Sequence, residues 1–244
     1  MMLLIAAELM RGWRPTRPAV LVLFAVAGAA ALGGVSALHQ GYQTLRPATS
    51  LQRANLAALE ITSSRVPPDL VLTPENSNNL YFNEIVAGPY LSAERKFGSP
   101  AYSTTELSTA PEPAQVGADK VLAAALQLAL RPVAQAPSPT GPAPRLLGPA
   151  GALVADGGGC IPVRPVRGAP PVVSLPPGGA ALEAKGGTSA NLYLRRYSSD
   201  SFPIFARTLR ANAVLSIPTD RSSLPWQLQL GATGPVTVCG LRGS

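Results

Sequence analysis

The single histidine of the sequence limits the catalytic mechanisms that these residues can support. His39 lies beside a long apolar stretch, away from most of the acidic residues. A Ser-His-Asp triad, a histidine-rich metal cage and most general-base schemes need an imidazole within the folded domain. Carboxylates such as Asp200 and Asp220 show no spacing that distinguishes them from solvated surface acids. We therefore predict no catalytic residue, no metal site and no cofactor.

The two cysteines, Cys160 and Cys239, are predicted to form a disulfide. They lie in the opening and closing segments of a region with strand-like sequence. In an exported domain, such a pair is more often oxidised than present as two free thiols, and two cysteines alone cannot complete a tetrahedral zinc site. Closing a loop of about 80 residues stabilises a fold by roughly 4 kcal/mol in the chain-entropy model.

The last part of the chain carries the basic excess and the candidate ligand-binding residues. Residues 131–244 contain eleven of the 20 Lys and Arg residues but four of the 13 Asp and Glu residues. A guanidinium group pairs well with phosphate or carboxylate, as in an anionic lipid-linked sugar or a cell-surface polymer. Arg195 and Arg196 are adjacent in a predicted strand, so only one of them can join a shared patch. The predicted ligand-binding residues are Arg195, Arg207, Arg210, Arg221 and Trp226.

Each of these assignments has an alternative. The arginines can form an ordinary solvated basic surface instead of a binding patch. Trp226, with Tyr193, Tyr197 and Phe202 nearby in sequence, could belong to an aromatic platform for sugars. It could equally pack in the core, where large aromatics usually lie in a small sandwich. No run of Lys and Arg with interleaved aromatics is present, so nucleic acid is not predicted as a partner.

A stretch of twenty uncharged residues, Ala19–Leu38, predicts a transmembrane helix. At 1.5 Å per residue, such a helix spans about 30 Å, the thickness of the hydrocarbon layer. Three arginines precede it, which places the N-terminus in the cytoplasm by the positive-inside rule. We therefore predict a single-pass cell-membrane protein with cytoplasmic residues 1–17, a transmembrane helix at 18–38 and an extracytoplasmic remainder.

A cleaved signal peptide is the alternative interpretation of the same stretch. Small residues at Val35-Ser36-Ala37 suit cleavage near Ala37, and the basic start also fits a signal peptide. The apolar stretch is longer than the usual signal core of about 7–15 residues, which favours the anchor. Both interpretations export the rest of the chain.

Beyond the apolar stretch, the sequence changes character twice. Residues 39–130 predict a small region of short helices, and residues 131–149 a Pro-rich linker or wrapped surface segment. Residues 150–244 contain six to eight short β-type runs, and Trp226–Leu230 alternates as a half-buried strand does. These runs predict an all-β sandwich or jelly-roll-like domain. The predicted fold class is therefore α+β overall, with a single transmembrane helix.

Three segments carry a resemblance to a known family. They are RxxxxLxRANLAALEI from Arg46 to Ile61, AGPYLSAERKFGSPAYSTTEL from Ala87 to Leu107, and IPTDRSSLPWQLQL from Ile217 to Leu230. With the apolar helix before them, they resemble the C-terminal portion of bacterial multi-pass membrane proteins similar to polyprenyl-phosphate-sugar-dependent glycosyltransferases. In that family the catalytic acid lies in the first extracytoplasmic loop of a many-helix domain, and these 244 residues contain no such domain. The resemblance therefore implies a role in cell-envelope glycan assembly without a catalytic residue to carry over.

The leading hypothesis from the sequence is a non-catalytic envelope protein that acts as the tail or accessory of a membrane glycosyltransferase. Its predicted partners are the membrane bilayer and a glycan or polyprenyl-phosphate sugar. One alternative is a structural domain that packs on a multi-pass membrane protein. The other is a glycosyltransferase in its own right.

Overall fold

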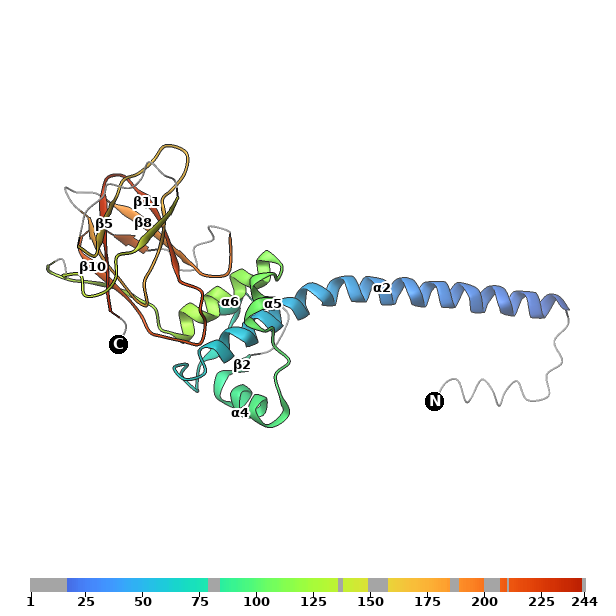
Figure 1. Ribbon diagram of the computed structural model, residues 1–244. Helices are drawn as coiled ribbons and strands as arrows, with labels where there is room; N and C mark the ends of the chain where they lie inside the picture. Colours follow the sequence, from blue (N-terminus) through green and yellow to red (C-terminus); the bar gives the residue numbers. More distant parts are fainter. Residues whose placement is uncertain are drawn as a thin grey trace. The chain divides into compact units, whose positions relative to one another are not determined.

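The computed structural model describes most of the chain in two separate units. The described residues are 17–78, 84–135, 138–148, 158–184, 189–199, 207–209 and 211–242. Met1–Pro47 belongs to one compact unit and Ala48–Ser244 to the other (Figure 1). Each unit is treated by itself below.

One long helix, α2 (Arg17–Ile61), joins two segments that the sequence predicts as separate helices. Pro47 lies inside it, and its missing N–H leaves the carbonyl of Gln43 without the usual helical partner. Large apolar side chains of the first unit are exposed, and Leu32 and Leu38 are so by more than 70%. Within the described residues, no helix meets the length and hydropathy expected of a membrane span. The predicted span at 18–38 includes side chains outside the described set, and it stays a prediction.

Short helices follow in the region predicted as helical. The elements are β1 (Val71–Leu72), α3 (Pro74–Ser77), β2 (Ile85–Val86), α4 (Ala87–Phe97), α5 (Thr104–Ser108) and α6 (Glu112–Ala125). Helix α4 ends at Gly98, whose φ of 89° suits glycine. Helix α6 lies very close to α2, because a Cβ at Gly117 would come 2.7 Å from the Leu51 side chain. The tight contact explains why a glycine is found within this helix.

In the described residues, ten further strands form two five-stranded sheets in which every pairing is antiparallel. The first sheet has the order β3 (Leu130–Pro132), β10 (Ala213–Ile217), β7 (Gly178–Ala184), β12 (Val236–Gly240), β5 (Cys160–Val163). The second has the order β4 (Arg145–Gly148), β6 (Val172–Ser174), β11 (Gln227–Ala232), β8 (Ala190–Arg195), β9 (Arg207–Leu209).

Both sheets contribute to one hydrophobic cluster. Alternate residues of β8 and β11, such as Leu192 and Leu228, are fully buried, as are Leu182 and Leu215 of the other sheet. The alternation predicted for Trp226–Leu230 is therefore confirmed, since side chains in a strand point to opposite faces in turn. The coarse part of the predicted fold class, α+β overall, is also confirmed, and the described elements are mostly β.

The Pro-rich segment 131–149 contributes two edge strands rather than a bare connection. Strand β3 borders the first sheet and β4 the second. Proline is tolerated at such edges because one side of an edge strand forms no ladder hydrogen bonds. Strand β4 also carries an irregularity in register between Leu146 and Gly148.

The predicted disulfide between Cys160 and Cys239 is confirmed. The two residues lie directly opposite each other on the neighbouring strands β5 and β12. The bond therefore ties an edge strand to the strand that ends the fold, across 79 positions of sequence.

Candidate binding pocket

A cavity of about 450 Å³ lies where several connections of the β part meet. One wall comes from the segment 218–226 between β10 and β11, and another from residues 175–177 between β6 and β7. Arg196, the first residue after β8, also lines the cavity. We call this cavity the Pro-Trp pocket, because its lining includes Trp226 and the prolines Pro176, Pro177, Pro218 and Pro225.

A buried ion pair holds the charged part of this pocket together. Arg196 Nη1 lies 2.5 Å from Asp220 Oδ2, with 6% and 1% of the two side chains exposed. Burying two charges costs free energy unless the remaining polar atoms are also bonded. Here Arg196 Nε donates to the Leu224 carbonyl at 2.7 Å, and Asp220 Oδ1 accepts from the Ser222 N–H at 2.8 Å. The pair therefore fixes the path of residues 220–224 as well as its own position.

Trp226 forms the apolar floor of the pocket and belongs to the hydrophobic core. The residue is 2% exposed, as the core interpretation of Trp226 requires. The Arg196 guanidinium lies 5.1 Å from the centroid of the indole, within the range of a cation–π contact. The Trp226 carbonyl accepts from the Leu175 N–H at 2.8 Å, which joins two walls of the pocket.

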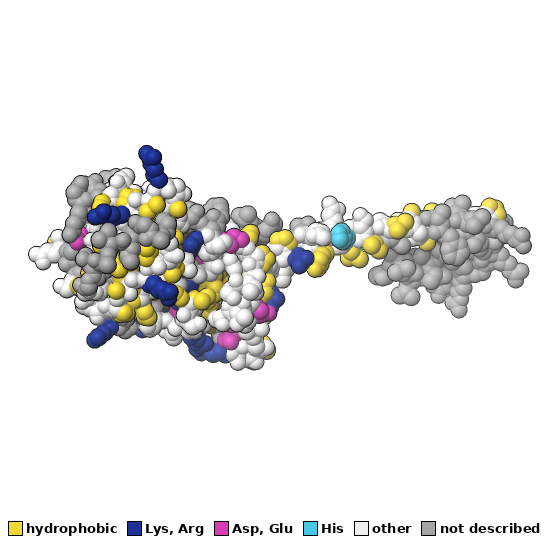
Figure 2. All heavy atoms as spheres, turned by 45° about the horizontal axis from the view of Figure 1, so that its top comes forward, with side chains coloured by type: hydrophobic (Ala, Val, Ile, Leu, Met, Phe, Trp, Pro, Cys, Tyr) yellow, Lys and Arg dark blue, Asp and Glu magenta, His cyan; other side chains and the backbone are white. Residues whose placement is uncertain are grey.

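The predicted arginine set does not come together as one patch in the described part of the chain. Arg195 Nε donates to Gln227 Oε1 at 3.1 Å, and its Nη1 donates to the Ser199 carbonyl. Arg221 is exposed. The Arg207 side chain and the whole of Arg210 lie outside the described residues. On the face shown in Figure 2, Lys and Arg side chains are scattered rather than gathered.

Among the predicted ligand-binding residues whose side chains the structure describes, Trp226 is the one that lines the Pro-Trp pocket. The arginine beside it is Arg196, whereas the sequence favoured its neighbour Arg195. Asp220, which the sequence left among the solvated acids, is buried. Two adjacent strand residues must face opposite ways, so the sequence indicates that only one of the two arginines can face a shared site. It does not indicate which of them does.

Asp119 of α6 binds the backbone turn that carries Arg196. Its side chain is fully buried, and its carboxylate accepts from the backbone N–H groups of Arg196, Tyr197 and Ser198 at 2.9–3.1 Å. The Ser198 hydroxyl donates to it as well, at 2.9 Å. Burial raises the pKa of the Asp119 carboxyl, and the hydrogen bonds from these donors oppose that rise. The helix thereby holds the turn that presents Arg196.

Sequence reasoning missed Asp119, although a signal was present. Val116 and Leu122 lie three residues to either side, so Asp119 falls on the apolar face of its helix. A charged residue on a buried face needs partners, because an unpaired buried charge is costly. A charged residue on the apolar face of a helix therefore indicates a structural role for Asp119.

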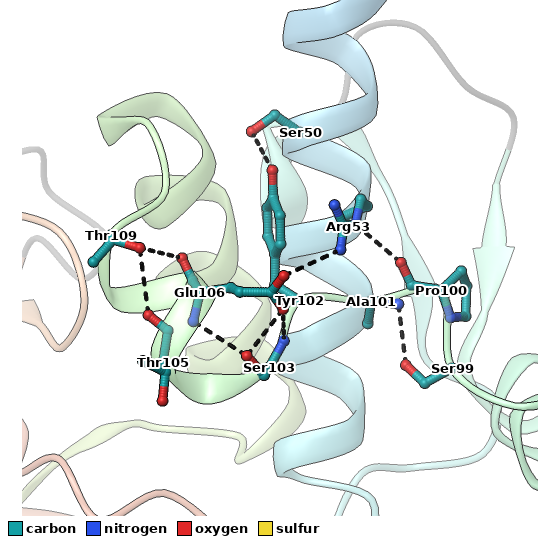
Figure 3. A network of polar contacts seen from close by, with 10 residues as sticks. All are labelled: Ser50, Arg53, Ser99, Pro100, Ala101, Tyr102, Ser103, Thr105, Glu106 and Thr109. Carbon is teal, nitrogen blue, oxygen red and sulfur yellow. Dashed lines mark hydrogen bonds and ion pairs between the residues drawn. The ribbon is translucent and has the colours of Figure 1, made fainter.

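A second polar cluster surrounds Arg53 of α2 and joins this helix to α5 (Figure 3). The guanidinium lies 4.2 Å from the Tyr102 ring centroid and donates to the Pro100 carbonyl at 3.1 Å. The Tyr102 hydroxyl donates to Ser50 Oγ at 3.0 Å. Glu106 caps its own helix through Ser103 and lies 3.7 Å from Arg53 Nη2. These groups satisfy one another, so the cluster fastens the loop before α5 to α2.

Among the described residues, no group of three or more His, Cys, Asp and Glu side chains could hold a metal ion. Asp220, the one carboxylate among the described residues that line the pocket, is engaged by Arg196 and Ser222. The arrangement is suited to holding a ligand by shape and hydrogen bonds.

Fold and pocket together define a mixed α+β protein, mostly β, with a disulfide and a small cavity formed by loops. No family model, no curated protein and no solved structure matches the chain. The resemblance to the tails of membrane glycosyltransferases therefore stays a prediction.

Proposed function

We propose that this chain is a non-catalytic, membrane-anchored protein of the cell envelope whose extracytoplasmic β-domain binds glycan. In this proposal it is the tail or accessory of a membrane glycosyltransferase, and the ligand is an envelope glycan or a lipid-linked sugar. The observation that carries the proposal is the Pro-Trp pocket, a cavity of about 450 Å³ with an apolar floor beside a guanidinium group. Ligand sites in proteins combine an apolar lining with a few polar groups in this way.

The order of the strands favours a binding fold. Without the edge strands β3 and β4, the two sheets have the orders β10-β7-β12-β5 and β6-β11-β8-β9. We infer a jelly-roll sandwich, because in that fold eight antiparallel strands form two Greek keys across two sheets. Lectin domains use this architecture. The likeness concerns fold alone, and the pocket carries the functional argument.

Two features support an extracytoplasmic location. The disulfide between Cys160 and Cys239 is a bond that persists in oxidising compartments and is rare in the cytosol. The uncharged segment Ala19–Leu38, preceded by three arginines, is typical of an anchor that leaves the rest of the chain outside.

The test is a binding titration of the full chain in detergent against envelope polysaccharides and a polyprenyl-phosphate sugar. The Ser223→Trp variant should weaken binding at least tenfold, because Ser223 is an exposed residue of the pocket lining and a large ring there fills the opening. The matched control is Thr105→Trp, an exposed position on α5. Absence of binding to every glycan, at low salt as well as at physiological salt, would remove the proposed function.

A scaffold role is the second candidate, and the exposed apolar residues of α2 favour it. Val35, Leu38 and Leu45 are each at least 60% exposed, which suits a helix that contacts lipid or another membrane helix. Co-purification of a multi-pass membrane protein with the detergent-solubilised chain would support this role.

A further inference from the structure

The charges of the Pro-Trp pocket determine which sugars it accepts. Arg196 and Asp220 are the only charged residues among those that line the described cavity. They lie 2.5 Å apart and are almost completely buried, so each neutralises the other. The sequence predicted that arginines bind a phosphate group. Such binding requires a guanidinium group whose charge is not already balanced by a carboxylate.

An anionic ligand would meet an unfavourable exchange at this pair. To bind phosphate through Nη1, Arg196 would have to leave Asp220, and the carboxylate would then stay buried without its counter-ion. Removing one partner of a buried pair is strongly destabilising for this reason. A side-on fork to phosphate would need Nε, which already donates to the Leu224 carbonyl, and an end-on fork would need Nη1, which already donates to Asp220. Each fork therefore competes with a bond that is present before the ligand arrives.

The other lining groups suit a neutral polyol. Four proline rings and Leu224 offer rigid apolar surface, on which the C–H face of a sugar ring can pack. Thr219 and Ser223 add hydroxyl groups that make no hydrogen bond within the described residues. Within the described residues, Arg196 forms its hydrogen bonds through Nε and Nη1, which leaves the donors of Nη2 for a ligand.

We propose that the Pro-Trp pocket binds an uncharged sugar unit and discriminates against sugar phosphates. This inference rests on the proposed glycan-binding function and selects the neutral glycan over the anionic lipid-linked intermediate. A volume of about 450 Å³ suits a ligand of one or two sugar residues. The selectivity comes from the Arg196–Asp220 pair, which is satisfied before any ligand arrives.

The experiment compares neutral and phosphorylated probes on the full chain in detergent. The neutral probes are methyl glycosides of mannose, galactose, glucose and arabinose, and the charged probes are mannose 6-phosphate, glucose 1-phosphate and inorganic phosphate. Saturation-transfer NMR gives the affinities at about 50 and 300 mM salt. We expect at least one neutral glycoside to bind ten times more tightly than any charged probe, with little effect of salt, since screening acts on charges.

Variants assign the binding to the pocket. Ser223→Trp should abolish binding of the neutral probe, and Thr219→Val should weaken it about three- to tenfold by removing one hydroxyl. Thr105→Val on α5 is the control and should change nothing. A neutral probe that binds equally well to Ser223→Trp would overturn the inference.

Two further outcomes separate this inference from the proposed function. Binding of sugar phosphates alone, with affinity that falls steeply as salt is raised, would refute neutral selectivity and leave glycan binding intact. Failure of every probe, together with failure of the envelope polysaccharides, would refute both.

Discussion

Asp119→Ala removes the acceptor that holds the turn at residues 196–198, and we expect a large loss of stability. The substitution leaves three backbone N–H groups and the Ser198 hydroxyl without their acceptor in a buried site. Each unsatisfied buried donor costs about 1–3 kcal/mol. The cost of burying the carboxylate is recovered at the same time. The net loss should therefore be about 3–5 kcal/mol, as when one partner of a buried pair is removed.

Thermal unfolding of the full chain, followed by circular dichroism, measures this loss. For a domain of this size, 1 kcal/mol lowers Tm by about 2–4 °C, so the variant should melt roughly 6–20 °C below the wild type. The control is Lys120→Ala, the next residue of α6, which is partly exposed and should shift stability by less than about 0.5 kcal/mol. Equal melting temperatures for the two variants would refute a supporting role for Asp119.

Three more predictions follow from individual residues. Burial raises the pKa of Asp119 in the folded state, so the folded chain binds more protons than the unfolded chain between the ordinary and the raised pKa. The stability of the wild type relative to Asp119→Asn should therefore fall as pH rises from about 4, and a rise across a pH series of urea unfolding curves would contradict this. Reduction of the disulfide between Cys160 and Cys239 should lower the free energy of unfolding by roughly 4 kcal/mol in urea, whereas thiol labelling of the unreduced chain would argue against the bond. Gly117→Ala should cost about 1–3 kcal/mol in the same assay, because its Cβ would collide with side-chain and backbone atoms. Gly28→Ala, which meets nothing within 4 Å, is its control, and an equal effect of the two would refute the close packing of α6.

The strands and the disulfide could be predicted because their signals are local. Alternation over a few residues, as at Trp226–Leu230, reports which side of a strand is buried without knowledge of its neighbours. The cysteine pair needed one further assumption, that the chain is exported. Neither inference depends on which loop meets which in space.

The pocket could not be predicted, because its parts are assembled by tertiary contacts. Arg196 and Asp220 are 24 positions apart, and no spacing in the sequence pairs them. The choice between Arg195 and Arg196 depends on where β8 ends, and strand ends are the least certain part of any sequence-based prediction. The composition of the Pro-rich segment likewise predicts a linker that lies outside the sheets. In the structure, β3 and β4 of this segment extend the two sheets at their edges, where proline is allowed.

Residues 48–244 form one compact unit even though the composition changes sharply along them. One hydrophobic cluster includes residues of α2, α6 and both sheets, and two polar connections add to it near the pocket. Asp119 of α6 holds the turn that presents Arg196 to the pocket. The Ile61 carbonyl, at the end of α2 where carbonyls lack helical partners, accepts from the Arg221 N–H within the pocket's longest wall. Because both connections reach segments that line the Pro-Trp pocket, its shape depends on helical residues that never touch a ligand.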